Sequence, residues 1–259
     1  FKLLAKEEIT PFGVHPGLFK FLPVVALAAA LTAALYVPLA GFIPAYSYKG
    51  DLIVTLYLLS AMTLCLGLAG ANTVNRFSVI GATRTLTQLF SYEAPFLLAM
   101  LGPAIVAGSW QISEINEYSR THLWIIVPQF IGFLVALVGL MGKLELPPFD
   151  APEAETEIVA GALTEYSGRG LALFSLARAV ELVVGLTLVT ALYLGGVGSG
   201  PLAAVLFTLK TIGLLVVIVV LQTLLARLRI DQTVNLWWRI GSVLVLVQWL
   251  LLILYGVLR

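Results

Sequence analysis

Long apolar stretches alternate with short polar segments along almost the whole chain. Seven of these stretches are long enough to cross a bilayer, whose hydrocarbon core of about 30 Å needs roughly 20 helical residues. We expect membrane-spanning helices at residues 21–43, 52–71, 88–108, 122–142, 171–194, 202–226 and 236–258. Prolines interrupt the first at Pro23 and Pro38 and the third at Pro95 and Pro103, where neighbouring helices must satisfy the freed carbonyls. The predicted fold class is an all-α integral membrane protein with about seven transmembrane helices.

Composition supports this prediction and excludes several kinds of site. Hydrophobic residues make up 60% of the chain and charged residues 11%, whereas soluble domains average about a quarter charged residues. The one cysteine, Cys65, excludes a disulfide framework and cysteine-ligated iron–sulfur or zinc sites within the chain. His15 and His122 form no cluster, the glycine-rich GGVGSG does not follow a strand, and the net charge of +1 disfavours nucleic acid. We expect no cofactor in this chain.

Basic residues outside the apolar stretches gather on one side of the predicted membrane. One side holds Lys2, Lys6, Lys20, Arg76, Arg84, Lys143, Arg169, Arg227, Arg229 and Arg239, and the other holds Lys49, Arg120 and Arg259. By the positive-inside rule, the first side and the first residue face the cytoplasm. FKLLAKEEI, within residues 1–20, predicts an amphipathic helix on the inner membrane surface. The sequence starts without an initiator Met, so we expect it to begin inside the protein.

The polar segment 143–170 is rich in acidic residues. It holds six of the fourteen acids, which are Glu145, Asp150, Glu153, Glu155, Glu157 and Glu165. Asp150, with Pro152 and Glu153 after it, resembles a capping box that opens a short helix, on which Glu153 and Glu157 share a face. Such crowding raises carboxyl pKa values, so the cluster can hold and exchange protons. A solvated acidic loop is the alternative, but Ile158, Val159, Ala162 and Leu163 predict partial burial.

Four ionisable residues fall inside predicted spans: Glu93, Arg178, Glu181 and Lys210. A charge at the centre of a membrane helix costs about 2.5–3.5 kcal/mol, so such groups usually face the bundle interior or water. Arg178 and Glu181, three residues apart, can pair as a structural bridge or as part of a conduction path. Lys210 lies roughly 12 Å into its span, and we expect it to face Glu181 or an acid of another chain. Glu93 has the alternative of reaching the membrane surface.

Four motifs in this sequence match one known family. They are FKLLAKEEITP, GATRTLTQLFSYEAP, LPPFDAPEAETEIVAGALTEYSG and RLRIDQTVN. Together they resemble the NuoH-type membrane subunit of bacterial complex I, which recurs in energy-converting membrane-bound NiFe hydrogenases. The resemblance runs from residue 1 to about residue 240. It implies a single membrane domain over 1–259, without the family's first helix, and a structured acidic loop at 143–170 on the cytoplasmic side of the cell membrane.

The resemblance also implies a role. In this family the NuoH-type protein contains no redox centre or catalytic site, and it connects peripheral iron–sulfur and hydrogenase-like subunits to antiporter-like, ion-pumping membrane subunits. Iron–sulfur clusters, and in hydrogenases a NiFe centre, belong to those partners. The family's coupling carboxylates match Glu93, Asp150, Glu153, Glu155, Glu157 and Glu165, and its basic loop positions match Arg76 and Arg84. From their burial we add Arg178, Glu181 and Lys210 as candidate relay residues.

One stretch departs from the family pattern. Quinone-using members carry E-T-N-R before P-P-F-D, whereas this chain has Lys143, Leu144, Glu145 and Leu146, which removes the arginine and shifts the acid. This departure favours a ferredoxin-linked hydrogenase or related reductase complex. Two alternatives stay open. One is the quinone-site subunit of an NADH- or ferredoxin–quinone oxidoreductase, and the other is a stand-alone secondary ion transporter that uses the same buried charges.

Overall fold

The structure, a computed structural model, is built of helices in the residues that it describes. These are residues 2–41, 44–122, 126–195, 198 and 200–257, without the side chains of residues 126, 155 and 255–257. The main helices are α1 (Pro16–Tyr36), α2 (Asp51–Ala71), α3 (Arg76–Ala107), α4 (Ile112–Thr121), α5 (Ile126–Lys143), α7 (Gly168–Tyr193), α8 (Pro201–Leu224), α9 (Ile230–Asn235) and α10 (Ser242–Val257). Short elements are η1 (Leu39–Gly41), η3 (Ala151–Glu153), α6 (Glu155–Ile158), η4 (Gly161–Leu163) and the π-helical η5 (Leu236–Gly241).

Helix length and hydropathy confirm the predicted fold class. Six of the described helices are long and apolar enough to cross a membrane. They are α1 with η1, α2, α3, α7, α8 and the continuous α9–η5–α10. The shorter apolar helix α5 coincides with the predicted stretch 122–142, so seven crossings stay a prediction. Helix α3 begins at Arg76, twelve residues before the predicted span, because the Asn75 side chain caps its first turn by accepting from the Phe77 amide at 3.0 Å.

The prediction of an amphipathic helix at the start of residues 1–20 is wrong, because the described residues 2–15 form no helix. Residues 2–5 form turns, and the first helix begins at Pro16. Pro11 and Gly13 oppose a helix in this segment, and an isolated helix of about eight residues is only marginally stable. The segment instead lies against the start of α7, where the Ile9 amide donates to Ser167 Oγ at 3.4 Å.

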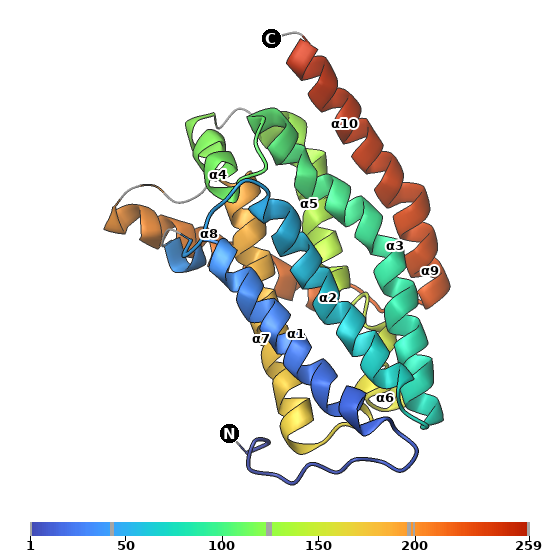
Figure 1. The fold of residues 1–259 in the computed structure, drawn as a ribbon. Helices are drawn as coiled ribbons and strands as arrows, with labels where there is room; N and C mark the ends of the chain where they lie inside the picture. The colour runs from blue at the N-terminus through green and yellow to red at the C-terminus, as the bar shows by residue number, and fades with distance from the viewer. Residues whose placement is uncertain (1, 42–43, 123–125, 196–197, 199, 258–259) are drawn as a thin grey trace.

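Helices α1, α2, α3, α5 and α7 pack around a common core, and α8 and α10 lie at the edges of the bundle (Figure 1). Tyr92, Phe96, Leu140 and Leu188 are among the fully buried side chains at its centre. Helix α8 is buried over only 17% of its most apolar window, so most of its apolar side chains face outward, as expected for contact with lipid or neighbouring subunits.

Two backbone carbonyls that lose their helical hydrogen bond because of a proline instead accept one from a tyrosine hydroxyl. Pro23 in α1 and Pro103 in α3 each leave the carbonyl four residues earlier without its helical partner. The Tyr166 hydroxyl donates to the first of these carbonyls at 3.3 Å, and the Tyr193 hydroxyl donates to the second at 2.5 Å. Both prolines are thereby accommodated within continuous helices, as membrane helices require.

The acidic loop folds onto the end of the bundle that also carries the N-terminal segment (Figure 1). Ser78 Oγ of α3 donates to the Ala162 carbonyl at 2.9 Å, and Gly81 lies so close to the loop that a Cβ there would contact the Gly161 backbone. Ile158 is buried, whereas Val159 is exposed, so the predicted partial burial holds for some of the apolar residues. The loop is a structured part of the bundle.

Candidate functional site

A buried lysine lies at the centre of the candidate site. Lys143 is the last residue of α5, and its side chain is 0% exposed. Its Nζ donates to Glu93 Oε2 of α3 at 3.2 Å and to Ser60 Oγ of α2 at 3.1 Å, and Ser60 also donates to Glu93. The rings of Tyr92 and Phe96 lie 5.6 and 5.5 Å from the ammonium, within reach of a cation–π interaction. Glu93 therefore turns inward to a cation of this chain.

An arginine joins the bundle to the acidic loop. Arg178 of α7 donates to Glu145 Oε2 at 2.8 Å and forms a second ion pair with Glu153. Its planar guanidinium presents five donors and suits two carboxylates at once. The prediction that Arg178 pairs with Glu181 is wrong. Among the described contacts, its ion pairs are with Glu145 and Glu153 of the loop.

Glu181 lies in the interior near both basic residues. It is buried, its Oε1 has no hydrogen-bond partner in the described part of the chain, and the charges of Lys143 and Arg178 both act on it. With Glu93, Glu145 and Glu153, it makes four acids beside two bases. The acids of this cluster therefore outnumber its bases.

Glu145 is the loop acid most changed by its surroundings. Its side chain is 4% exposed, and burial raises its pKa from 4.5 to about 7, although the Arg178 guanidinium opposes the rise. A carboxyl group with that pKa changes its protonation near neutral pH, which is the property required of a proton-exchanging group.

We expect the raised pKa of Glu145 to appear as a pH-dependent stability. The unfolded chain releases this proton near pH 4.5 and the folded chain near pH 7. The stabilisation is therefore present at low pH and is lost as the pH rises between these values, by about 3 kcal/mol in total. Melting temperatures of wild type and Glu145→Gln between pH 4.5 and 8 test this, because the variant should have a flatter slope. Equal slopes would contradict it, and the exposed Glu117→Gln serves as the control.

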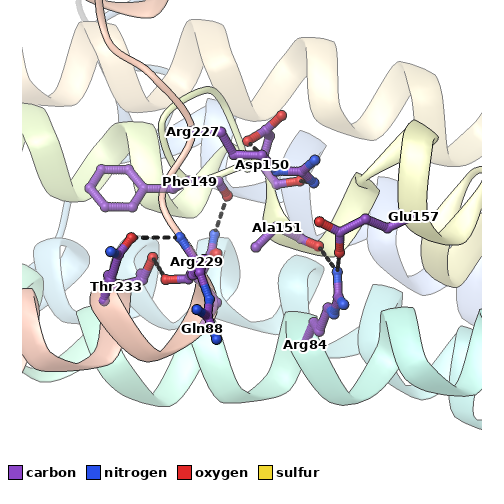
Figure 2. A network of polar contacts seen from close by, with 10 residues as sticks. Arg84, Gln88, Phe149, Asp150, Ala151, Glu157, Arg227, Arg229 and Thr233 are labelled. Carbon is purple, nitrogen blue, oxygen red and sulfur yellow. Dashed lines mark hydrogen bonds and ion pairs between the residues drawn. The ribbon is translucent and has the colours of Figure 1, made fainter.

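Two further arginines fix the other side of the loop (Figure 2). Arg84 of α3 lies 2.6 Å from Glu157 Oε2 and lowers the pKa of this carboxyl group. Arg227, before α9, donates through Nη2 to the Asp150 carbonyl at 2.9 Å, and its Nε lies 3.2 Å from Asp150 Oδ1. Gln88 donates to the Phe149 carbonyl at 2.8 Å. These contacts hold the acidic loop between α3 and the start of the last span.

The remaining loop candidates have different surroundings. Glu165 accepts a hydrogen bond from the Asn75 side chain at the start of α3. Arg76 is exposed and makes no ion pair among the described residues. The Glu155 side chain lies outside the described part of the structure. Among the described contacts, neither Glu165 nor Arg76 joins the buried charges.

Lys210 lies far along the bundle from those charges. Its Nζ donates to the carbonyls of Leu194 and Gly195 at 2.7 Å each, just past the end of α7. The prediction that it pairs with Glu181 is therefore wrong, and pairing with an acid of another chain stays a prediction. A cation at a helix C-terminus satisfies unpaired carbonyls and stabilises the helix dipole, which explains this position.

Sequence reasoning missed four residues of the site as candidates: Ser60, Gln88, Lys143 and Arg227. Glu145 was included among the loop acids but not among the relay residues. A signal existed for Lys143 and Glu145, because they stand in the stretch that departs from the family pattern. A serine, a glutamine and a loop arginine give no such signal, because their importance depends on which distant residues they contact.

A family model described as "NADH dehydrogenase" matches residues 1–253. This chain belongs to the NADH dehydrogenase family. An NADH-quinone oxidoreductase subunit of the H type from Carboxydothermus hydrogenoformans is 32% identical over 245 residues, which cover 92% of this chain and 69% of that protein. The corresponding protein of Brevibacillus brevis is 33% identical over 246 residues, with 92% and 73% coverage. Members of this NuoH-like group are membrane subunits of complex I-type complexes, and so is this chain.

A solved structure has the same fold. A chain of the membrane-bound sulfane sulfur reductase, described as an archaeal respiratory membrane complex, superposes with a TM-score of 0.86. The match covers 97% of this chain and 84% of that chain at 23% sequence identity. As a member of the NADH dehydrogenase family, this chain is membrane-integral and assembles with other subunits, which carry the cofactors. Within the described residues, no group of three or more His, Cys, Asp or Glu is placed to hold a metal ion.

Proposed function

We propose that this chain couples electron transfer in a peripheral iron–sulfur arm to translocation of protons or sodium ions. The complex would be a ferredoxin-linked membrane-bound hydrogenase or a related reductase. The observation that carries the proposal is the series of buried and partly buried charges from the acidic loop into the bundle. Glu145 and Glu153 share Arg178, Glu93 binds Lys143, and Glu181 lies within the fields of both bases.

Electrostatics explains how such a series can transmit a redox event. Two unit charges 4 Å apart interact by about 4 kcal/mol at an effective dielectric constant of 20, which corresponds to roughly 3 pKa units. An electron that arrives on a cluster beside the loop would favour protonation of Glu145. Protonation would weaken its hold on Arg178, and the change in charge would then act on Glu181 and Glu93.

Two features of the chain support the orientation and the partners of this proposal. The excess of basic residues on the loop side supports a cytoplasmic position of the loop, where iron–sulfur and hydrogenase-like subunits would cover it. The outward apolar faces of α8 and α10 would contact antiporter-like membrane subunits or lipid.

A quinone-reducing complex is the second candidate, because the relatives that are 32–33% identical are named NADH-quinone oxidoreductase subunits. The stretch before P-P-F-D favours the first candidate, since Lys143 and Glu145 are both engaged in ion pairs within the chain. The stand-alone transporter loses support, because the chain is a NuoH-like subunit of a larger complex. The cofactors and electron acceptor of the purified complex separate the two candidates.

The proposal is tested with Glu93→Gln and Glu145→Gln in the assembled complex. The amide keeps the shape of the side chain and cannot carry the proton, so we expect electron transfer to persist and ion translocation to fall at least about tenfold. Both are measured in proteoliposomes as electron-transfer rate and ion uptake. Glu117→Gln, an exposed glutamate of α4, is the matched control and should behave as wild type. Full ion translocation in both Glu93→Gln and Glu145→Gln would refute the relay.

A further inference from the structure

A π-helical turn interrupts the last candidate span close to the buried charges. Within the continuous α9–η5–α10, residues Leu236–Gly241 form the π-helical η5. The Ser242 amide donates to the Trp237 carbonyl, five residues earlier, as in a π-helix. The Trp238 carbonyl, which this amide would bind in an α-helix, accepts a hydrogen bond from the Ser242 hydroxyl instead. A side chain thus satisfies the carbonyl that the wider turn leaves free, and turns of this kind are frequent at functional sites.

The π-helical turn directs Trp237 into the bundle. The residue is 2% exposed, and its ring lies beside two aromatic rings of the candidate site. The centroid of the Phe149 ring in the acidic loop is 5.7 Å away, and the centroid of the Tyr92 ring in α3 is 6.4 Å away. Both separations fall in the range of favourable aromatic pairs. Trp237 therefore connects the last span to both the loop and α3.

Both of these neighbouring rings belong to segments that hold the charges. Tyr92 directly precedes Glu93, and its ring centroid lies 5.6 Å from the Lys143 ammonium. Phe149 is part of the acidic loop, and its carbonyl accepts a hydrogen bond from a glutamine of α3 (Figure 2). A displacement of the Trp237 ring would act on the buried ion pair through Tyr92 and on the loop through Phe149.

The backbone of the turn, more than its surroundings, sets the position of the Trp237 ring. The indole Nε1 has no hydrogen-bond partner in the described part of the chain, so no such bond holds the ring. An apolar hollow of about 150 Å³ lies next to the ring, with Leu134 and Val138 of α5 in its lining. Because only close-packed neighbours oppose a displacement, a ring with free space beside it depends on its backbone for its position.

We propose that Trp237 is a positioning residue of the charge series. The π-helical turn holds its ring against Tyr92 and Phe149, and these contacts keep the acidic loop and the buried ion pair of α3 and α5 in one relative arrangement. Without the ring, the charges would remain but would be less well placed to influence one another. The expected effect on ion translocation rests on the proposed coupling role, whereas the effect on the ion pair does not.

The ratio of ions translocated to electrons transferred in the assembled complex tests the proposal. We expect Trp237→Ala to lower this ratio at least about threefold and Trp237→Phe to restore most of it, because phenylalanine keeps an aromatic ring at this position. A merely structural role would reduce the amount of complex and both rates together, which leaves the ratio unchanged. Trp238→Ala, at the exposed neighbour, is the matched control and should keep the wild-type ratio. A wild-type ratio in Trp237→Ala would overturn the proposal.

A second pair of variants keeps the tryptophan and moves its ring. Gly241→Ala places a methyl group 2.8 Å from Trp237 Cε3, so the ring must shift. Gly213→Ala in α8 is the control, because a Cβ there would meet no described atom within 4 Å outside its own helix. We expect Gly241→Ala to lower the ratio of ions to electrons and Gly213→Ala to leave it unchanged. Equal ratios in these two variants would overturn the proposal.

A thermodynamic cycle separates failure of this inference from failure of the proposed function. Denaturant unfolding of the full chain measures how much Lys143→Met destabilises wild type and Trp237→Ala. We expect the loss to be smaller by at least about half in Trp237→Ala, because a displaced Tyr92 loosens the buried ion pair. If this holds while Glu93→Gln translocates ions normally, the positioning role stands and the coupling role fails. An undiminished loss would overturn the positioning role, whatever the translocation shows.

Discussion

Lys143→Met will lower the free energy of unfolding by about 3–5 kcal/mol, because it leaves the partly buried Glu93 without its cation. Methionine fills a similar volume, so the effect will come from charge and hydrogen bonding rather than from a cavity. The double variant Lys143→Met with Glu93→Gln should recover most of the loss, since the amide carries no charge. Denaturant unfolding of the full chain in detergent measures the single and double variants as a thermodynamic cycle.

A second double variant identifies which acid Lys143 balances. If Lys143→Met is rescued by Glu93→Gln and not by Glu181→Gln, the direct contact with Glu93 dominates. If both acids rescue, the ammonium is shared between α3 and α7. Lys20→Met, an exposed lysine of α1, is the control and should change stability by less than about 0.5 kcal/mol. A loss in Lys143→Met no greater than in Lys20→Met would contradict the buried ion pair.

The membrane helices could be predicted because the bilayer imposes one length and one polarity on each of them. The early start of α3 could not be predicted, because its first three turns mix apolar residues with arginines and threonines. They are helical through the Asn75 cap and through packing against a loop far along the chain. The prediction of an N-terminal amphipathic helix failed for a related reason. Periodicity identifies an apolar face, but it does not reveal that this segment lies against Ser167 instead of forming a helix.

Charges inside the predicted spans could be located from the sequence, but Lys143 and the partners of these charges could not. The cost of a charge in the membrane predicts that a partner exists, and local spacing favoured Glu181 for Arg178. The arginine instead pairs with acids 33 and 25 residues away, which only the folded loop brings close. Lys210 was misassigned because the carbonyls at a helix end, its actual acceptors, leave no trace in residue type.

Arg178→Gln should measure how much the long-range pairing of Arg178 contributes to the free energy of unfolding. The substitution leaves Glu145 and Glu153 side by side without their cation, and we expect a loss of about 3 kcal/mol in the free energy of unfolding. Arg120→Gln, which breaks the exposed Arg120–Glu117 pair of α4, is the matched control and should cost less than about 1 kcal/mol. Similar losses in the two variants would contradict a structural role for the bridge.

The same variant should change the protonation of the loop. In the wild type, the Arg178 guanidinium lowers the pKa of Glu145. Removing the guanidinium should therefore move that pKa above about 7 and keep the carboxyl group protonated at neutral pH. Infrared titration of the protonated-carboxyl band measures this, with Glu145→Gln identifying the band. Arg178→Lys restores a charge but offers no planar fork for two carboxylates, so we expect an intermediate pKa. A band that titrates as in wild type in Arg178→Gln would mean that burial alone sets the pKa of Glu145 and that the arginine does not tune it.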